Sequence, residues 1–176
     1  MAFSVRPADL DESILPAESP EQHVQRLALD KARFRAETGE LVLAADTVVI
    51  LDEEILGKPR DTQDARAMLA RLAGRSHTVL SGVAVIDGTQ GRSAHGLACT
   101  KVHLLAMSAA EIAWYVDTGE PMDKAGSYAI QGLGALFVDG IEGNYSNVVG
   151  LPIPLTRSLF SKLGLDLRQF CRPGGA

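Results

Sequence analysis

Asp46 is the residue whose type fits its surroundings least in this sequence. It lies inside LVLAADTVVIL, residues 41–51, an apolar and β-branched run that predicts a buried strand. An unpaired carboxylate there would be costly unless it met a cation, a metal ion or hydrogen-bond donors. Because strand ends in α/β proteins face ligand crevices, Asp46 is a candidate catalytic residue. The alternative is a structural aspartate that hydrogen-bonds a neighbouring turn.

Glu12 is the second acidic candidate, and it lies beside Asp11 after a short extended stretch. Two carboxylates brought to one crevice are a common way to hold Mg²⁺, which prefers oxygen ligands, water and substrate phosphates. A solvated acidic loop is the alternative interpretation.

Lys31 and Lys58 are candidate ligands for phosphate oxygens. Lys31 interrupts the apolar face of a predicted helix, so its ammonium could bind an anion, or its stem could run along apolar surface to water. Lys58 lies between Gly57 and Pro59, in a loop that follows the strand of Asp46. A loop lysine that serves only solubility is the alternative for Lys58.

The glycine-rich stretch of residues 119–134 holds Lys124, Gly126 and Gln131. Such loops let backbone approach a ligand closely, and a glutamine amide can read the polar edge of a base. An ordinary surface turn is the alternative. The sequence contains neither a P-loop nor a G-x-G-x-x-G fingerprint, and its histidines and cysteines lack the spacing of zinc or thiol sites.

The elements that must position these residues follow two different hydrophobic periods. Alternating helices and strands predict an α/β domain with a mixed sheet. The predicted helices cover Ser19 to about Gly39, Asp61 or Thr62 to about Ala73, Ser108 to before Gly119, and 153–164; the predicted strands cover 41–51, 77–87, 97–106 and 135–141; and 53–61, 88–96, 119–134 and 144–152 are predicted loops.

Length and composition are those of one globular domain. The chain has 176 residues, 46% hydrophobic and 22% charged, with a formal charge of −5. This balance disfavours a binder of nucleic acid polymers, which would need clustered basic residues. Cys99 and Cys171 are too few for a disulfide framework, and no apolar run is long enough for a bilayer. A soluble cytoplasmic protein without a membrane segment is therefore expected.

Several motifs, in order along the chain, resemble the Maf family of nucleoside triphosphate pyrophosphatases, which is historically linked with inhibition of septum formation. The resemblance covers nearly the whole chain from residue 3 onward. The motifs are DES at 11–13, RLALDKA at 26–32, AADTVV at 44–49, ILGKPRD at 55–61, MLARLAGRSHTVLSGV at 68–83, YVDTGEPMDKAGSYAIQG at 115–132 and IEGNYSNVVGLPI at 141–153.

The resemblance implies an activity and a fold. The family hydrolyses nucleoside triphosphates to the monophosphate and pyrophosphate with a divalent metal, Mg²⁺ or Mn²⁺. Its fold is a mixed, elongated α/β sheet with flanking helices and two lobes around a cleft, often in a homodimer. The KAGSYAIQG motif resembles that of the branch that acts on dTTP and UTP. The branch that acts on 7-methyl-GTP is the alternative.

The resemblance also implies roles for single residues. Asp46 matches the proton acceptor that activates water and also helps the metal site, and Glu12 matches a metal-side carboxylate. Lys31 and Lys58 match the lysines that hold the triphosphate. Thr47 and Gln131 match positions associated with substrate choice.

One segment of the family pattern has no counterpart here. Family members carry a strand, a Ser-x-Ser-Pro-Arg-Arg loop and a helix ahead of the DES motif, whereas this sequence begins at MAFSVRPADLDES. Residues 1–176 are therefore expected to form a single Maf-like domain without that first strand and helix. A misassigned start or a shortened chain, a natural short form with weak catalysis, and a nucleotide-binding or septum-regulating protein without turnover are the three interpretations.

Overall fold

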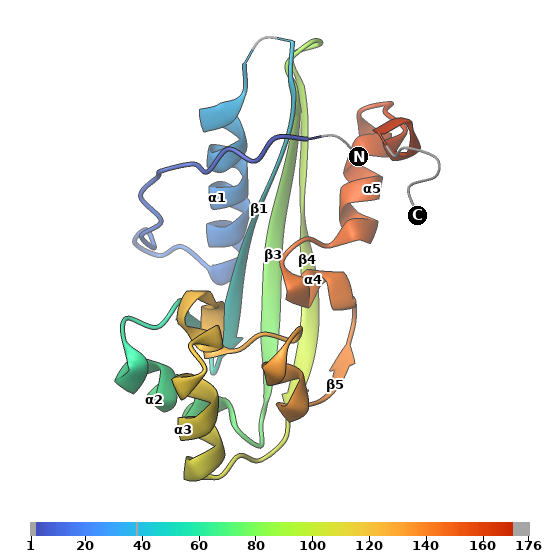
Figure 1. The fold of residues 1–176 in the computed structure, drawn as a ribbon. Coiled ribbons are helices and arrows are strands. Elements are labelled where there is room, and N and C mark those ends of the chain that lie inside the picture. Colours follow the sequence, from blue (N-terminus) through green and yellow to red (C-terminus); the bar gives the residue numbers. More distant parts are fainter. Residues whose placement is uncertain (1–2, 38, 171–176) are drawn as a thin grey trace. The chain divides into compact units, whose positions relative to one another are not determined.

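The computed structural model describes residues 3–37 and 39–170, so Cys171 lies outside the described residues. Figure 1 shows helices and a sheet of long strands. The helices are α1 (Pro20–Arg35), α2 (Thr62–Leu72), α3 (Ala109–Asp117), α4 (Tyr145–Val149) and α5 (Ile153–Lys162); the strands are β1 (Leu41–Leu51), β2 (Glu54–Leu56), β3 (Ser76–Asp87), β4 (Arg92–Leu104) and β5 (Val138–Glu142); and 3₁₀ turns cover Glu120–Asp123, Ala125–Ser127, Leu133–Phe137 and Leu167–Phe170.

The five strands form one sheet in the order β2-β1-β3-β4-β5. β1 pairs antiparallel with β2, and β4 with β5. Residues 88–91 are too short a connection for anything but an antiparallel β3–β4 pair. Gly39 and Glu40, just before β1, exchange backbone hydrogen bonds with Gly88, just after β3, so this pair is antiparallel too. The α/β class is confirmed, and the parallel pairs that a mixed sheet would include do not occur among the described strands.

The chain divides into two compact units. The first unit comprises residues 1–46, 82–97 and 153–176, and the second comprises 47–81 and 98–152. Strands β1, β3 and β4 each contribute one part to each unit. The expectation of a single Maf-like domain stays a prediction.

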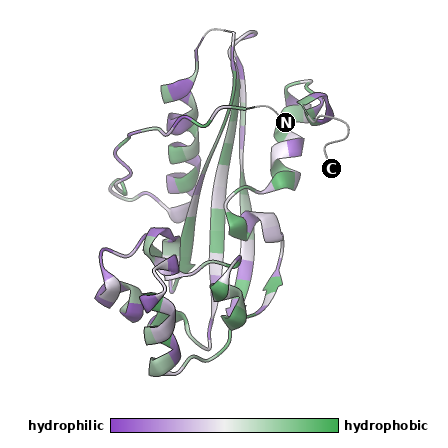
Figure 2. Ribbon diagram, viewed as in Figure 1, coloured by the Kyte–Doolittle hydropathy of each residue, from purple (hydrophilic) through white to green (hydrophobic). Residues whose placement is uncertain are grey.

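The first unit is built on β3, whose alternate side chains point to opposite faces of the sheet. Val83 packs in a cluster with Leu159 of α5, and Ala84 packs in another with Ala28 of α1. The two helices therefore cover opposite faces, as Figure 1 also shows. Figure 2 shows hydrophobic and hydrophilic residues alternating along α1, as expected of a helix with one buried face.

Helix α1 begins where its sequence predicts. Ser19 accepts a hydrogen bond from the backbone of Gln22, whose side chain accepts one from the Ser19 backbone. Pro20 occupies the first helical turn, where its missing N–H costs nothing. The capping box thus fixes the start of the helix that carries Lys31.

The second unit has its own core, which α2 and α3 close. Leu69 and Leu72 of α2 pack with Tyr115 of α3 and with Val102 of β4, and all four are at most 1% exposed. The Tyr115 hydroxyl donates to Glu120 and accepts a hydrogen bond from the Ala129 backbone. This buried hydroxyl ties the turn after α3 to the loop that leads to β5.

Several expected loops contain regular structure. Residues 53–61 include the short strand β2, and 144–152 include α4, which Asn144 caps. The predicted loop of 119–134 holds 3₁₀ turns, and β4 begins within the predicted loop of 88–96.

The strand predicted at 135–141 begins only at Val138. Glu120 is the reason, because its carboxylate accepts hydrogen bonds from the backbones of Leu133 and Gly134 and holds the preceding residues in a 3₁₀ turn.

Candidate active site

Three residues that the sequence singled out meet in the first unit. The Lys31 ammonium nitrogen lies 2.6 Å from Oε1 of Glu12 and 2.7 Å from Oδ1 of Asp46. Lys31 comes from α1, Asp46 from β1, and Glu12 from the segment before α1. One ammonium thus bridges two carboxylates.

The electrostatics of this cluster favour the charged form of Lys31. Burial would lower the pKa of Lys31, but hydrogen bonds and charges from Asp46 and Glu12 outweigh it, so the pKa of Lys31 is raised. The Asp46 side chain is only 9% exposed. The ammonium therefore supplies the cation without which a carboxylate in this strand would be costly.

The segment that carries Glu12 is fastened to α1 through Arg26. Its guanidinium donates to the Ser13 carbonyl at 3.0 Å and to both carboxylate oxygens of Glu18. Hydrogen bonds from Arg26 first, and then from the Leu15 backbone and His23, outweigh desolvation and hold the pKa of Glu18 far below its ordinary value. Arg26 therefore fixes the approach of Glu12 to Lys31.

The donor chemistry of Glu12 and Asp46 fits a divalent metal of the Mg²⁺ kind. Both are oxygen ligands directed at one cation position, which the Lys31 ammonium fills. Mg²⁺ takes one or two protein carboxylates and completes its shell with water and phosphate. Among the described residues, no group of three or more histidines, cysteines and acids could enclose a metal by itself.

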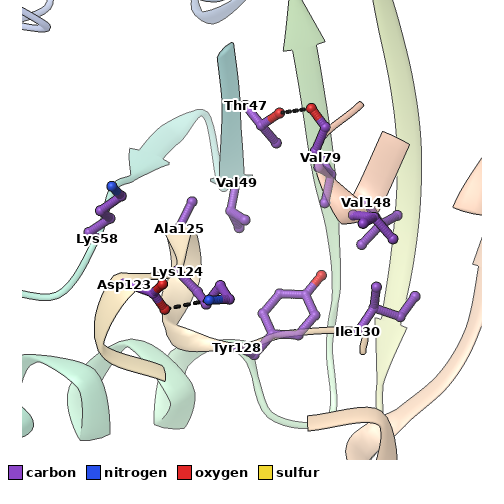
Figure 3. A pocket seen from close by; sticks show the side chains of 12 residues that line it. Thr47, Val49, Lys58, Val79, Asp123, Lys124, Ala125, Tyr128, Ile130 and Val148 are labelled. Carbon is purple, nitrogen blue, oxygen red and sulfur yellow. Dashed lines mark hydrogen bonds and ion pairs between the residues drawn. The ribbon is translucent and has the colours of Figure 1, made fainter. Parts of the chain in front are cut away.

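The second unit contains a pocket of about 210 Å³, shown in Figure 3. Its walls are mostly aliphatic, with the hydroxyls of Thr47 and Tyr128 and three charged side chains among them. The lining residues are Thr47, Val49, Lys58, Val79, Asp123, Lys124, Ala125, Tyr128, Ile130, Val148, Val149 and Gly150.

Backbone conformation shapes one side of this pocket. Gly126 has a φ of 70° and donates a hydrogen bond to the Gly57 carbonyl, next to Lys58. A Cβ at Gly126 would lie 3.0 Å from the Val49 side chain, so glycine serves both the left-handed conformation and the close approach. The loop of Lys58 and the turn at 125–127 are thereby joined.

The hydroxyl of Thr47 is held by neighbours on β3 and after α4. It lies 2.7 Å from the Ser81 hydroxyl and donates to the Gly150 carbonyl at 3.3 Å. Of the charged lining residues, Lys124 forms an ion pair with Asp123, and its hydrogen bond lowers the pKa of that carboxyl. Lys58 has no ion pair among the described residues.

A buried polar pair on the pocket wall escaped the sequence analysis. Nε2 of His77 lies 2.7 Å from the hydroxyl of Tyr128, and the two rings meet edge to face. The histidines lack the spacing of zinc sites, and Tyr128 lies within the motif at 115–132, so neither His77 nor Tyr128 is a predicted site residue. The available signal was the two-residue spacing of His77, Val79 and Ser81, which places their side chains on one face of a strand.

The predicted site residues fall into three groups. Glu12, Lys31 and Asp46 form the cluster in the first unit, and Thr47 and Lys58 line the pocket in the second. Gln131 is exposed and is not among the lining residues, although its neighbour Ile130 is. The roles expected for these residues remain predictions.

The fold and these residues define an α/β protein with a carboxylate–ammonium cluster in one unit and a ligand-sized pocket of mixed polarity in the other. The chain belongs to the Maf family: the family model described as "Maf-like protein" matches residues 1–163. The expected family is confirmed.

Relatives named "dTTP/UTP pyrophosphatase" match most of the chain. The protein of Anaeromyxobacter sp. (strain Fw109-5) is 52% identical over 178 residues, covering 99% of this chain and 85% of that protein. The protein of Anaeromyxobacter dehalogenans (strain 2CP-C) is 51% identical, covering 95% and 86%, and that of Desulfotalea psychrophila is 53% identical, covering 87% and 80%.

Within residues 3–37 and 39–170, no helix has both the length and the hydropathy that crossing a bilayer requires.

Proposed function

We propose that this protein hydrolyses dTTP and UTP to the nucleoside monophosphate and pyrophosphate. Two findings support the proposal: the chain belongs to the Maf family, and relatives named "dTTP/UTP pyrophosphatase" are 51% and 52% identical to it. The observation that carries it is the part-buried Asp46 carboxylate, whose Oδ1 is bound by Lys31. The alternative substrate, 7-methyl-GTP, receives no support from the names of these relatives.

Asp46 is the proposed proton acceptor. Its Oδ1 accepts from Lys31, whereas its Oδ2 accepts no hydrogen bond from the described residues. A water bound at Oδ2 would be oriented by a carboxylate that strand β1 and the Lys31 contact hold in place. General-base help of this kind typically contributes about 10²–10⁴-fold in rate.

Glu12 and Asp46 would hold a divalent metal, Mg²⁺ or Mn²⁺, together with phosphate oxygens. Such a metal supplies neutralisation of charge on the phosphate oxygens during attack on the anhydride. Lys31 already contacts both carboxylates and would remain close to them when the metal is bound.

The remaining proposed roles are binding of the phosphates and binding of the base. Lys31 and Lys58 would bind phosphate oxygens, since phosphoryl transfer depends chiefly on positioning and on neutralising charge. The aliphatic walls and hydroxyls of the second unit's pocket suit an uncharged pyrimidine base. Thr47, which lines the pocket, and Gln131 remain the candidates for substrate choice. Because nucleoside triphosphates are the proposed substrates, the cytoplasm is the expected compartment.

The test is pyrophosphate release from dTTP and UTP with Mg²⁺ present, by the wild type and by Asp46→Asn. The variant keeps the size of the side chain but removes its basicity, so turnover should fall at least 100-fold. Asp117→Asn, an exposed change far along the chain on α3, is the matched control and should keep wild-type turnover. Full activity of Asp46→Asn would refute the assignment of the base. Tight nucleotide binding by the wild type without any turnover would favour a binding protein instead.

A further inference from the structure

The pair of His77 and Tyr128 gives the pocket of the second unit a polar group that the proposed function has not used. His77 is 3% exposed and Tyr128 is 6% exposed, so both side chains are buried. Their hydrogen bond, 2.7 Å from Nε2 to the hydroxyl oxygen, is buried. Tyr128 lines the pocket, and His77 lies behind it.

His77 is uncharged at neutral pH. Burial first, and then the nearby charge of His103, lowers the pKa of His77 to about 4. A neutral imidazole carries one hydrogen, on Nδ1 or on Nε2. The position of that hydrogen decides whether Tyr128 donates to His77 or accepts from it.

The surroundings of Nδ1 settle the position of this hydrogen. Nδ1 of His77 is buried and has no hydrogen-bond partner among the described residues. A buried N–H without an acceptor is rarer and more costly than a bare acceptor without a donor. The hydrogen therefore belongs on Nε2, where it is donated to the Tyr128 oxygen.

The consequence is that the Tyr128 hydroxyl hydrogen points away from His77. Because the Tyr128 oxygen accepts from His77, its own hydrogen must point elsewhere, and this hydroxyl makes no other hydrogen bond among the described residues. In the view of Figure 3 the hydroxyl lies on the side of the ring that faces Val79 and Val148, two other lining residues. The pocket wall thus presents a hydrogen-bond donor among aliphatic side chains.

We propose that His77 and Tyr128 act together as a specificity determinant: His77 orients the Tyr128 hydroxyl as a donor, which selects pyrimidines with a carbonyl oxygen over those with an amino group. This inference rests on the proposed function. Thymine and uracil carry an acceptor oxygen, O4, where cytosine carries the amino donor N4–H₂. A cytosine would set donor against donor at this position, and sites built for a hydrogen bond reject ligands that cannot make it.

The experiment compares kcat/KM for dTTP and dCTP, and for UTP and CTP, in the wild type and three variants. The wild type should prefer the carbonyl bases at least 10-fold. Tyr128→Phe should lower that preference about 10-fold, mainly by lowering kcat/KM for dTTP. His77→Phe should also lower it, because the Tyr128 hydroxyl can then accept as well as donate. His77→Gln, whose amide can donate from a similar position, should restore much of it.

The controls separate specificity from structure. Tyr145→Phe removes an exposed hydroxyl outside the pocket and should leave the preference unchanged. Equal losses for dTTP and dCTP in Tyr128→Phe would show a merely structural role and overturn the inference, as would equal wild-type rates on the two substrates.

Failure of the proposed function gives a different pattern. If the wild type hydrolyses no nucleoside triphosphate, the same variants are titrated with dTMP and dCMP by calorimetry. A preference for dTMP that Tyr128→Phe removes would then support the inference without turnover, and equal binding of both would refute it.

Discussion

At the scale of single residues, Lys31 explains how a carboxylate is tolerated in the apolar strand β1. The sequence showed that Asp46 needed a partner but could not show which one, because Lys31 is separated from it by a helix end and a turn. The ammonium that pairs with Asp46 also contacts Glu12, so three residues that the sequence presents as separate candidates form one network. Removing Lys31 would leave both carboxylates without their cation, whereas removing one carboxylate would leave Lys31 paired with the other.

His77 makes the stability of the protein sensitive to mild acid. Its pKa is about 4 in the folded state and 6.5 unperturbed, so the unfolded chain takes up the proton first as the pH falls. Stability is therefore lost between about pH 6.5 and pH 4, by roughly 2 kcal/mol between about pH 7 and pH 5. Urea unfolding of the wild type and His77→Gln at these two pH values measures the difference.

The variant supplies the control for this titration. Glutamine does not ionise in this range, so His77→Gln should lose about 2 kcal/mol less than the wild type on the same change of pH. Equal losses in the two proteins would show that His77 is already accessible to protons in the folded state.

At the scale of elements, Gly82 sets how closely α1 approaches the sheet. A Cβ on Gly82 would lie 2.1 Å from the Val24 carbonyl oxygen, so Gly82→Ala must push the backbone of α1 away from β3. We expect a loss of about 1–3 kcal/mol from overpacking. At about 2–4 °C per kcal/mol for a chain of this size, the thermal midpoint should fall by several degrees in calorimetry.

A second glycine provides the comparison for Gly82→Ala. A Cβ on Gly140 of β5 would meet no neighbouring heavy atom within 4 Å, so Gly140→Ala should leave the thermal midpoint nearly unchanged. Because Lys31 lies on α1, Gly82→Ala should also lower turnover, whereas Gly140→Ala should not. A stable and fully active Gly82→Ala would show that α1 can move without cost.

Elements with local signals were predictable, and those fixed by distant contacts were not. The helix starts predicted at Ser19 and Ser108 are confirmed, and each start has a capping box that closes within a few residues. The 3₁₀ turn before β5 depends on Glu120, which lies more than ten residues earlier. The short strand β2 and helix α4 likewise depend on tertiary partners, which periodicity over a few residues does not reveal.

The candidate site divides in the same way. Asp46 and Lys31 were predictable as candidate site residues, because a charged side chain in apolar surroundings is costly without a partner. His77 and Tyr128 did not, because each is ordinary in its strand or loop. Only the fold shows that they share a hydrogen bond with one nitrogen left unpaired.

At the scale of the whole molecule, the two units share three strands. β1, β3 and β4 each contribute one part to each unit, so the two units contain parts of the same three strands. The chain contains one tryptophan, Trp114, in the second unit, whereas the far-ultraviolet circular dichroism reports on both. The two signals therefore distinguish cooperative from independent unfolding.

Leu159→Ala makes that distinction from the first unit. Leu159 is fully buried in the cluster around Val83, and the truncation should cost about 2–5 kcal/mol. We expect the urea midpoint of Trp114 fluorescence, in the second unit, to fall together with the midpoint of the circular dichroism. Ser161→Ala, an exposed change on the same helix, should move neither signal. A fluorescence transition that stays at its wild-type midpoint while the circular dichroism separates into two steps would mean that the shared strands do not couple the units.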